Sequence, residues 1–192
     1  MLIGFTGAQS TGKTTLLNRM VNDTNYRKCS YVKEVTRKVA RYGLNINELG
    51  DNETQLFILS EHLTNHHLKG CNVLDRCILD GWVYTHYLYE QGKVDKWVAT
   101  YATNLLKVLS TKLDVVFYTD PTDVPLVDDS VRSVDHSFRE GIIYKYNQLL
   151  FEENSPEEYA KSIRDKTVVL SGTIDQRYNI LKDTLKNHDT TR

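Results

Sequence analysis

A glycine-rich segment near the amino terminus carries the residue types that bind phosphate. It fits the pattern G-x-x-x-x-G-K-[ST] and consists of Gly7, Ala8, Gln9, Ser10, Thr11, Gly12, Lys13 and Thr14, followed by Thr15. Glycines let main-chain N–H groups turn toward an anion, and a following helix adds unpaired N–H donors. We therefore predict that residues 7–15 bind the phosphates of ATP, with Lys13 on the β- and γ-phosphates and the Thr14 hydroxyl on Mg²⁺. The alternative is a glycine-rich turn that binds nothing.

An acid and an arginine end a short apolar segment further along the chain. Residues 72–75 favour a strand that ends at Asp75, and Arg76 follows directly. The Asp75 carboxylate could bind Mg²⁺, or it could accept a proton from an attacking hydroxyl, and both roles remain open. Arg76 is a candidate for binding substrate or phosphate. The alternatives are a helix-capping acid and a surface arginine.

A second charged pair follows the predicted strand at residues 28–32. Glu34 and Arg37 are three residues apart, so they share one face of the predicted helix 34–42. A carboxylate and a guanidinium on one face could hold a hydroxylated, anionic substrate. An ordinary intrahelical ion pair is the alternative.

Two arginines lie in or beside a charged segment with little apolar periodicity. Arg132 and Arg139 fall at residues 121–140, which we predict to be a lid that brings arginine to the transferring phosphoryl group. A solvated charged loop is the alternative. Gly172 follows the last predicted strand, where a loop could contact the adenine ring.

Two further patterns predict other sites less well. His62 and His66 are one turn apart on a predicted helix, but no cysteine or acid completes a zinc motif, so we predict an exposed helix face. The segment from Thr111 to Asp114 resembles the guanine-reading motif of GTPases, but it precedes a strand instead of following one. A GTPase is therefore not favoured.

Strands and helices alternate along the chain. The five predicted strands cover residues 1–6, 28–32, 72–75, 113–119 and 167–170. This alternation predicts an α/β three-layer sandwich, in which a five-stranded parallel sheet has helices on both faces. The carboxyl ends of the strands then form the active-site edge, where Glu34, Asp75 and Gly172 would meet.

Composition limits the classes of protein that fit. The 192 residues suit one domain, 1–192, and a net charge of −1 argues against a large basic surface while leaving a local basic patch open. Three scattered cysteines, Cys29, Cys71 and Cys77, predict reduced thiols and a cytoplasmic location. Because no apolar run approaches a membrane span, we expect no membrane contact.

These residues resemble the P-loop kinases of the nucleoside and nucleotide kinase group. The resemblance covers most of the chain and rests on Gly7–Thr14, Glu34-Val35-Thr36-Arg37, Val73-Leu74-Asp75-Arg76, residues 114–120 and Val131-Arg132-Ser133. It includes the branch of ribosylnicotinamide kinases and small phage kinases. The pair Asp75-Arg76 is similar to that of thymidylate and deoxynucleoside kinases, although Cys77 replaces their usual serine or aromatic residue.

The resemblance implies the P-loop NTPase fold and a kinase that transfers the γ-phosphoryl group of ATP, with Mg²⁺, to a nucleoside, nucleotide or related acceptor. The catalytic candidates are Lys13, Asp75, Arg132 and Arg139, and the acceptor-side candidates are Glu34, Arg37 and Arg76. Two alternatives remain open, a kinase that acts on a modified base in DNA and a regulatory ATPase that switches a partner. A homodimer also remains open.

Overall fold

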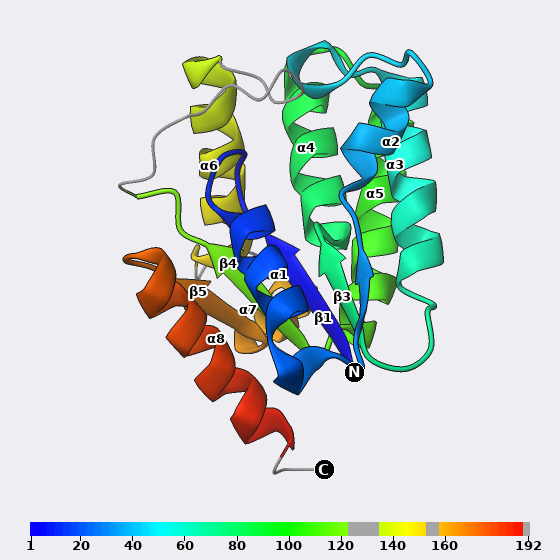
Figure 1. Cartoon of the computed structure of the whole chain (residues 1–192). Helices are drawn as coiled ribbons and strands as arrows, with labels where there is room; N and C mark the ends of the chain where they lie inside the picture. The colour runs from blue at the N-terminus through cyan, green and yellow to red at the C-terminus, as the bar shows by residue number, and fades with distance from the viewer. Residues whose placement is uncertain (123–134, 153–157, 190–192) are drawn as a thin grey trace.

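A computed structural model describes residues 1–122, 135–152 and 158–189 of the chain. Its centre is a five-stranded, all-parallel sheet with the strand order β2-β3-β1-β4-β5 (Figure 1). The strands are β1 (Leu2–Thr6), β2 (Ser30–Val32), β3 (Asn72–Asp75), β4 (Val115–Thr119) and β5 (Thr167–Leu170). All five agree with the strands that the sequence predicts.

Eight α-helices cover the sheet in the described part of the chain. They are α1 (Lys13–Asn22), α2 (Val35–Arg41), α3 (Asn52–Asn65), α4 (Ile78–Glu90), α5 (Lys96–Leu109), α6 (His136–Leu150), α7 (Glu158–Asp165) and α8 (Ile174–Asp189). Short 3₁₀ turns occupy Thr24–Tyr26, Asn47–Leu49 and Ser110–Lys112. The predicted alternation of strands and helices is therefore confirmed.

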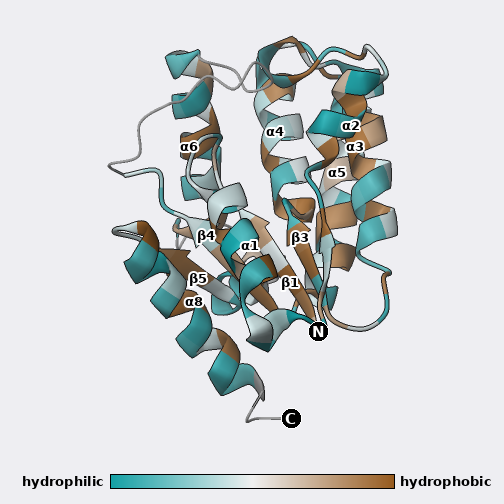
Figure 2. Ribbon diagram, viewed as in Figure 1, coloured by the Kyte–Doolittle hydropathy of each residue, from teal (hydrophilic) through white to brown (hydrophobic). Residues whose placement is uncertain are grey.

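The helices form a layer on each face of the sheet, because the strands bury side chains on both sides (Figure 2). Ile3 and Phe5 of β1 point toward α1 and α8, where they pack with Leu16 and Leu181. Leu2 belongs to the other core, which is built mainly from α3, α4, α5 and α6. The fold is thus the three-layer α/β sandwich that the sequence predicts.

Parallel pairing brings the functional ends of the strands to one edge. β1 pairs with β3 so that Phe5 lies opposite Asp75, and it pairs with β4 so that Thr6 lies opposite Tyr118. The segments that follow β1, β2, β3 and β5 therefore emerge side by side. The segment from Thr111 to Asp114 lies at the opposite edge, where the Asp114 carboxylate accepts from the main-chain N–H of Leu2 at 2.6 Å.

The cysteine prediction is wrong for two of the three residues. Cys29 and Cys71 form a disulfide that joins the residues just before β2 and β3, and their Cα atoms are 4.6 Å apart. The register explains this pair, because Ser30 lies opposite Asn72 and the preceding residues are therefore neighbours. Cys77 is a buried free thiol. The cysteines consequently give no argument for a reducing compartment.

The predicted exposed histidine face is also wrong. His62 is 1% exposed and His66 is 3% exposed, and both pack between α3 and α4, whereas His67 is exposed. Burial lowers the pKa of His62 to about 3 and that of His66 to about 4, so both rings are neutral. The described residues contain no group of three or more His, Cys, Asp or Glu that could hold a metal ion.

None of the helices in the described ranges is long and apolar enough to cross a membrane.

Candidate active site

The glycine-rich segment forms a tight loop between β1 and α1. Gly7 has a φ of +136°, and a Cβ at this position would lie 2.5 Å from the Thr119 hydroxyl oxygen at the end of β4. Gly12, with a φ of +86°, directly precedes α1. Only glycine allows both conformations without strain. The motif therefore forms the strand–loop–helix arrangement that suits an anion.

Lys13 folds back into this loop. Its ammonium group donates to the carbonyl oxygens of Gly7 at 2.8 Å and Ala8 at 2.6 Å, and to the Thr11 hydroxyl at 3.2 Å. The side chain is buried, and burial, followed by repulsion from Arg76, lowers the pKa of Lys13 to about 7. The loop therefore holds the Lys13 amine where phosphates would bind.

Thr14 and Asp75 meet beside the loop. The Thr14 hydroxyl donates to the Asp75 carboxylate at 3.2 Å, which joins the first turn of α1 to the end of β3. Burial and the neighbouring Glu34 raise the pKa of the Asp75 carboxyl. A hydroxyl and a carboxylate at this distance are the ligand types that Mg²⁺ takes in nucleotide sites. These two residues fit a shared Mg²⁺ ion.

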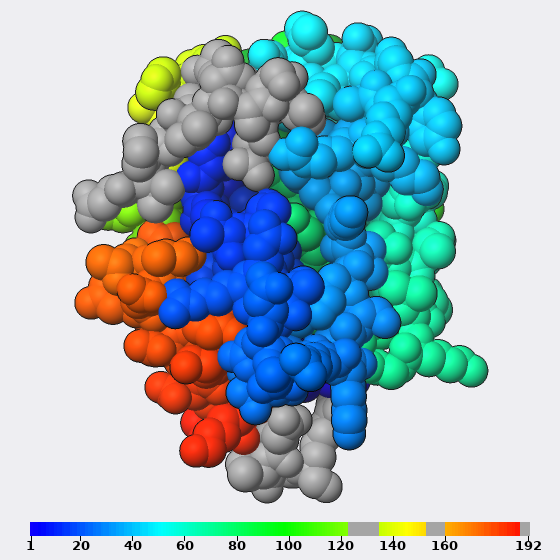
Figure 3. Space-filling model, viewed as in Figure 1, coloured from blue at the N-terminus to red at the C-terminus, as the bar shows by residue number. Residues whose placement is uncertain are grey.

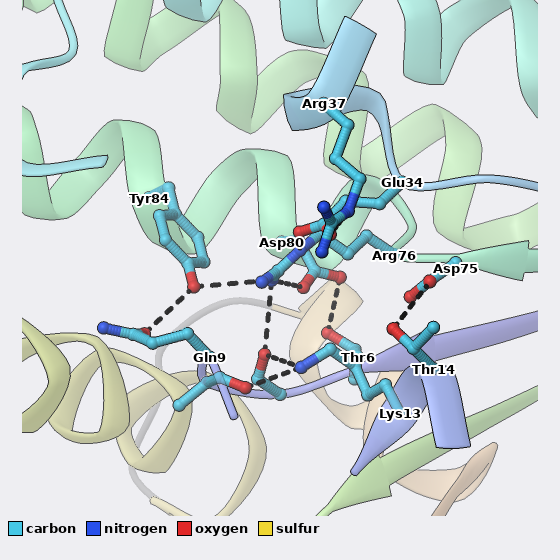
Figure 4. A network of polar contacts seen from close by, with 12 residues as sticks. Thr6, Gln9, Lys13, Thr14, Glu34, Arg37, Asp75, Arg76, Asp80 and Tyr84 are labelled. Atoms are coloured by element: carbon cyan, nitrogen blue, oxygen red, sulfur yellow. Dashed lines mark hydrogen bonds and ion pairs between the residues drawn. The ribbon is translucent and has the colours of Figure 1, made fainter. Parts of the chain in front are cut away.

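Arg76 is the centre of a buried charge network (Figure 4). Its Nε donates to the Glu34 carboxylate at 2.5 Å, and its Nη1 donates to the Asp80 carboxylate at 2.8 Å. The same Nη1 lies 3.3 Å from the Gly7 carbonyl oxygen of the phosphate loop. Arg76 has a φ of 74°, so its backbone leaves β3 in the left-handed region that non-glycine residues rarely adopt. The surface-arginine alternative does not apply.

Asp80 anchors this network, and sequence reasoning missed it. Its carboxylate accepts from the Thr6 hydroxyl at 2.8 Å, the Tyr146 hydroxyl at 2.8 Å and the main-chain N–H of Cys77 at 3.0 Å. Asp80 lies in the first turn of α4, whereas Arg76 precedes the helix with a positive φ, so helical spacing does not predict their contact. Tyr146 comes from α6, and no local pattern predicts that contact.

Gln9 connects the phosphate loop to α4 and α6. Its side-chain carbonyl oxygen accepts from the Tyr84 hydroxyl at 3.3 Å, and Tyr84 in turn lies 3.4 Å from Arg76 Nη1. Arg139, in the first turn of α6, donates to the main-chain oxygen of Gln9 at 3.4 Å. The loop therefore contacts one of the two arginines predicted for the lid.

Arg177 links the last strand to the loop. Its Nε donates to the Gly172 carbonyl oxygen at 2.8 Å, and its Nη1 donates to the Thr11 carbonyl oxygen at 3.0 Å. Gly172, with a φ of +82°, is thereby fixed next to the phosphate loop. Sequence reasoning named Gly172 but missed Arg177, because a buried arginine on a polar helix has no local signature.

A small pocket lies on the α4 side of the network. It has a volume of about 30 Å³ and is lined by residues that include Gln55, His62, Arg76, Asp80 and Tyr84. The imidazole Nδ1 of His62 is buried there without a hydrogen-bond partner, and Gln55 accepts from the Thr85 hydroxyl at 3.0 Å. The cavity thus combines hydrogen-bonding groups with apolar walls.

The predicted residues divide into three groups. Lys13, Thr14, Glu34, Asp75 and Arg76 converge on one site, and Arg37 joins it through an ion pair of 3.6 Å with Glu34. Arg139 and Gly172 contact the phosphate loop directly or through Arg177. Thr15 is exposed on α1, and Arg132 lies outside the described residues, as does most of the predicted lid.

Comparison with known proteins shows the family of this chain. The model of an AAA domain family matches residues 2–177. The chain belongs to this AAA domain family. A comparison with curated protein sequences gave no match.

Solved structures of kinases share the fold. A deoxyadenosine kinase from M. mycoides, with dCMP and dCDP bound, matches with a TM-score of 0.69 and 15% identity, covering 97% of this chain and 99% of the other. NadR in complex with NR matches with a TM-score of 0.64 and 16% identity, covering 97% of this chain and 50% of NadR. The chain therefore has the P-loop kinase fold.

Proposed function

We propose that this protein is an ATP-dependent kinase that transfers a phosphoryl group to a hydroxyl of a nucleoside, nucleotide or related small acceptor. The observation that carries the proposal is the convergence of Lys13, Asp75, Glu34 and Arg76 around one loop of main-chain N–H groups. A regulatory ATPase needs the first two groups. Because hydrolysis also needs a carboxylate to activate water, the dependence of ADP release on an acceptor is what separates the two functions.

The donor side consists of the phosphate loop, Lys13, Thr14 and Asp75. Loop N–H groups and the Lys13 ammonium bind the phosphates of ATP, exchanging the internal contacts of Lys13 with loop carbonyls for contacts with phosphate oxygens. Thr14 and Asp75 would hold Mg²⁺, which neutralises charge on the phosphates when it is bound. This arrangement favours Asp75 as a metal ligand over Asp75 as a base.

The acceptor side consists of Glu34, Arg76 and the small pocket beside Arg76. Glu34 takes the proton of the acceptor hydroxyl while the hydroxyl oxygen bonds to the γ-phosphorus of ATP. The bond between the γ-phosphorus and the β–γ bridging oxygen breaks at the same time, and ADP is released. Arg76 fixes the orientation of Glu34. Because a cavity of about 30 Å³ has room for roughly one water molecule, the walls must separate when an acceptor enters.

Arg139 and Arg132 complete the proposed site. Arg139 already lies against the phosphate loop, and it could reach the transferring phosphoryl group when the acceptor is bound. The lid role of Arg132 remains a proposal from the sequence. Exclusion of water from the closed site would protect ATP from hydrolysis.

The test is ADP release measured with and without a panel of nucleosides and nucleotides, followed by the mass of the acceptor. We expect acceptor-dependent ADP release and a gain of one phosphoryl group in the acceptor. The Lys13→Ala variant should lose the activity but keep the fold. The Glu34→Gln variant should lower kcat about 10²- to 10⁴-fold with little change in the KM for ATP. ADP release that is independent of every acceptor would support the ATPase switch instead.

A further inference from the structure

Positive charge is segregated into one segment of this nearly neutral chain. Residues 24–47 contain one acidic residue, Glu34, and six basic residues, which are Arg27, Lys28, Lys33, Arg37, Lys38 and Arg41. The segment therefore carries a net charge of +5, which leaves −6 for the remaining residues of a chain whose total is −1. The balanced total conceals a local basic region of the kind that contacts polyanions.

Four of these basic residues line one groove. It has a volume of about 690 Å³, and its walls include Lys33, Arg37, Lys38 and Arg41 on the α2 side and Glu61 on α3. Arg37 pairs with Glu34 at 3.6 Å, and Lys38 pairs with Glu61 at 2.7 Å. Lys33 and Arg41 are exposed and make no ion pair within the part of the chain that the structure describes. The groove therefore has an excess of positive charge.

The groove lies next to the candidate active site. A second hollow of about 190 Å³ shares Val32, Lys33, Glu34 and Arg37 with it and is also lined by Thr14 and Asp75. Figure 3 shows this face, where the hollow lies between the blue α1 and the lighter blue segment that contains β2 and α2. A ligand longer than the groove can therefore pass over the shared residues toward the Thr14–Asp75 pair.

An exposed aromatic ring completes the groove. Tyr42 is 63% exposed and lines the groove. Its ring packs against that of Phe57, with the ring centroids 5.4 Å apart. A supported, exposed tyrosine beside several cations is a combination that binds single-stranded nucleic acid, because bases stack on the ring while phosphates contact the cations. The cations also extend over the length of α2, about 10 Å, which exceeds the reach of a single phosphate.

We propose that this basic groove binds a single strand of nucleic acid, with its phosphates along Lys33, Arg37, Lys38 and Arg41 and a base on Tyr42. The binding does not depend on the kinase reaction proposed above. If that reaction also holds, the acceptor can be a group carried on the strand as well as a small molecule. The free phosphate of a mononucleotide is the competing explanation for the same charges.

The experiment measures fluorescence anisotropy of a labelled oligothymidylate of about 16 nucleotides, without ATP, over a range of salt concentrations. The groove variant combines Lys33→Gln, Lys38→Gln and Arg41→Gln, which leaves the active-site residue Arg37 intact. The control variant combines Lys69→Gln, Lys96→Gln and Lys161→Gln, three exposed lysines elsewhere with the same change in charge. Circular dichroism checks that both variants fold.

We expect the groove variant to weaken binding at least about tenfold and to reduce the slope of log K against log salt by about 2, since three phosphate contacts are lost. The control variant should bind like the unmodified protein. If the triple variant does not fold, Lys33→Gln and Arg41→Gln can be tested singly, because neither residue makes an ion pair in the described ranges.

Three results would overturn the proposal. The unmodified protein could show no binding at low salt, the two triple variants could lose affinity equally, or dTMP could displace the oligonucleotide at a comparable concentration. The last result would assign the groove to a phosphorylated small acceptor. Because the assay contains no ATP, its outcome is separate from that of the kinase test.

Discussion

Two buried carboxylates near one loop have different neighbours, which is why we propose different roles for them. Asp75 contacts the Thr14 hydroxyl of the phosphate loop helix, whereas Glu34 contacts the guanidinium of Arg76. The first arrangement suits a shared metal ion, and under the proposed function the second would orient Glu34 as a base. Such a division of roles by environment is typical of sites that contain paired acids.

The lowered pKa of Lys13 predicts that ATP binding takes up a proton. The ammonium group has a pKa of about 7 in the free protein because of burial and Arg76, and phosphates of bound ATP would raise it. At pH 8, about 0.9 proton should be taken up per ATP bound, and far less at pH 6. Titration calorimetry in buffers of different ionisation enthalpy measures this uptake.

The Lys13→Arg variant is the control for this prediction, because a guanidinium does not lose its proton. It should show no dependence of the binding enthalpy on the buffer. Equal binding enthalpies in all buffers at pH 8 for the unmodified protein would contradict the assignment of the proton to Lys13.

At the residue scale, the sequence predicts side chains whose partners lie nearby in a motif. Lys13 and Thr14 follow from the loop pattern, and Asp75 follows from the end of an apolar strand. The main partner of Glu34 is Arg76, 42 residues away, and the shared-face argument for Arg37 could not find it. Arg177 was missed for the same reason, because only tertiary folding brings it to Thr11.

At the element scale, α4 is fixed to the sheet through Asp80. Its carboxylate joins Thr6 of β1, Arg76 after β3 and Tyr146 of α6. We expect Asp80→Asn to reduce the free energy of unfolding by about 3–5 kcal/mol, because it leaves the Arg76 charge buried with one carboxylate partner fewer. Urea denaturation measures the change.

The exposed Asp183 on α8 offers a matched control for this substitution. Asp183→Asn should change the free energy of unfolding by no more than about 0.5 kcal/mol. Equal stabilities of the two variants would show that Asp80 does not anchor α4.

The order and type of the elements could be predicted because apolar strands and capped helices alternate clearly. The disulfide could not be predicted from the sequence, because its formation depends on which strands are neighbours and on their register. Once β2 and β3 are known to be adjacent, with Ser30 opposite Asn72, the pairing of Cys29 and Cys71 follows. The total charge of −1 likewise does not show where the charges lie, and Arg37, Lys38 and Arg41 all fall on α2.

Reduction of the disulfide should destabilise the protein. The bond spans 42 residues, and closing a loop of that length lowers the entropy of the unfolded chain by an amount worth about 4 kcal/mol. A reductant should therefore lower the urea midpoint of the unmodified protein. The Cys29→Ser variant should already have the lower midpoint and should not respond to reductant. An equal urea midpoint of the unmodified protein with and without reductant would contradict the stabilising role of the disulfide.

At the scale of the whole molecule, the buried histidines predict a loss of stability in mild acid. The pKa values of His62 and His66, about 3 and about 4, lie below the value of about 6.5 in the unfolded chain. Between the folded-state and unfolded-state pKa values, the unfolded chain therefore binds more protons than the folded protein. The free energy of unfolding consequently falls as the pH drops through 6.5. From pH 7 to pH 5, each of the two rings should lower the free energy of unfolding by about 2 kcal/mol.

The hydrogen bonds of His66 also indicate that its protonation destabilises the folded protein. Its Nδ1 donates to the His62 carbonyl oxygen at 2.7 Å, while its Nε2 accepts from the main-chain N–H of Ile78 at 3.4 Å. A proton on Nε2 would abolish the second bond and place a charge between α3 and α4. Denaturant midpoints measured between pH 7 and pH 5 should fall steeply for the unmodified protein and less steeply for His66→Gln. The exposed His67→Gln control should follow the unmodified protein, and a flat profile for the unmodified protein would show that the rings accept protons in the folded state.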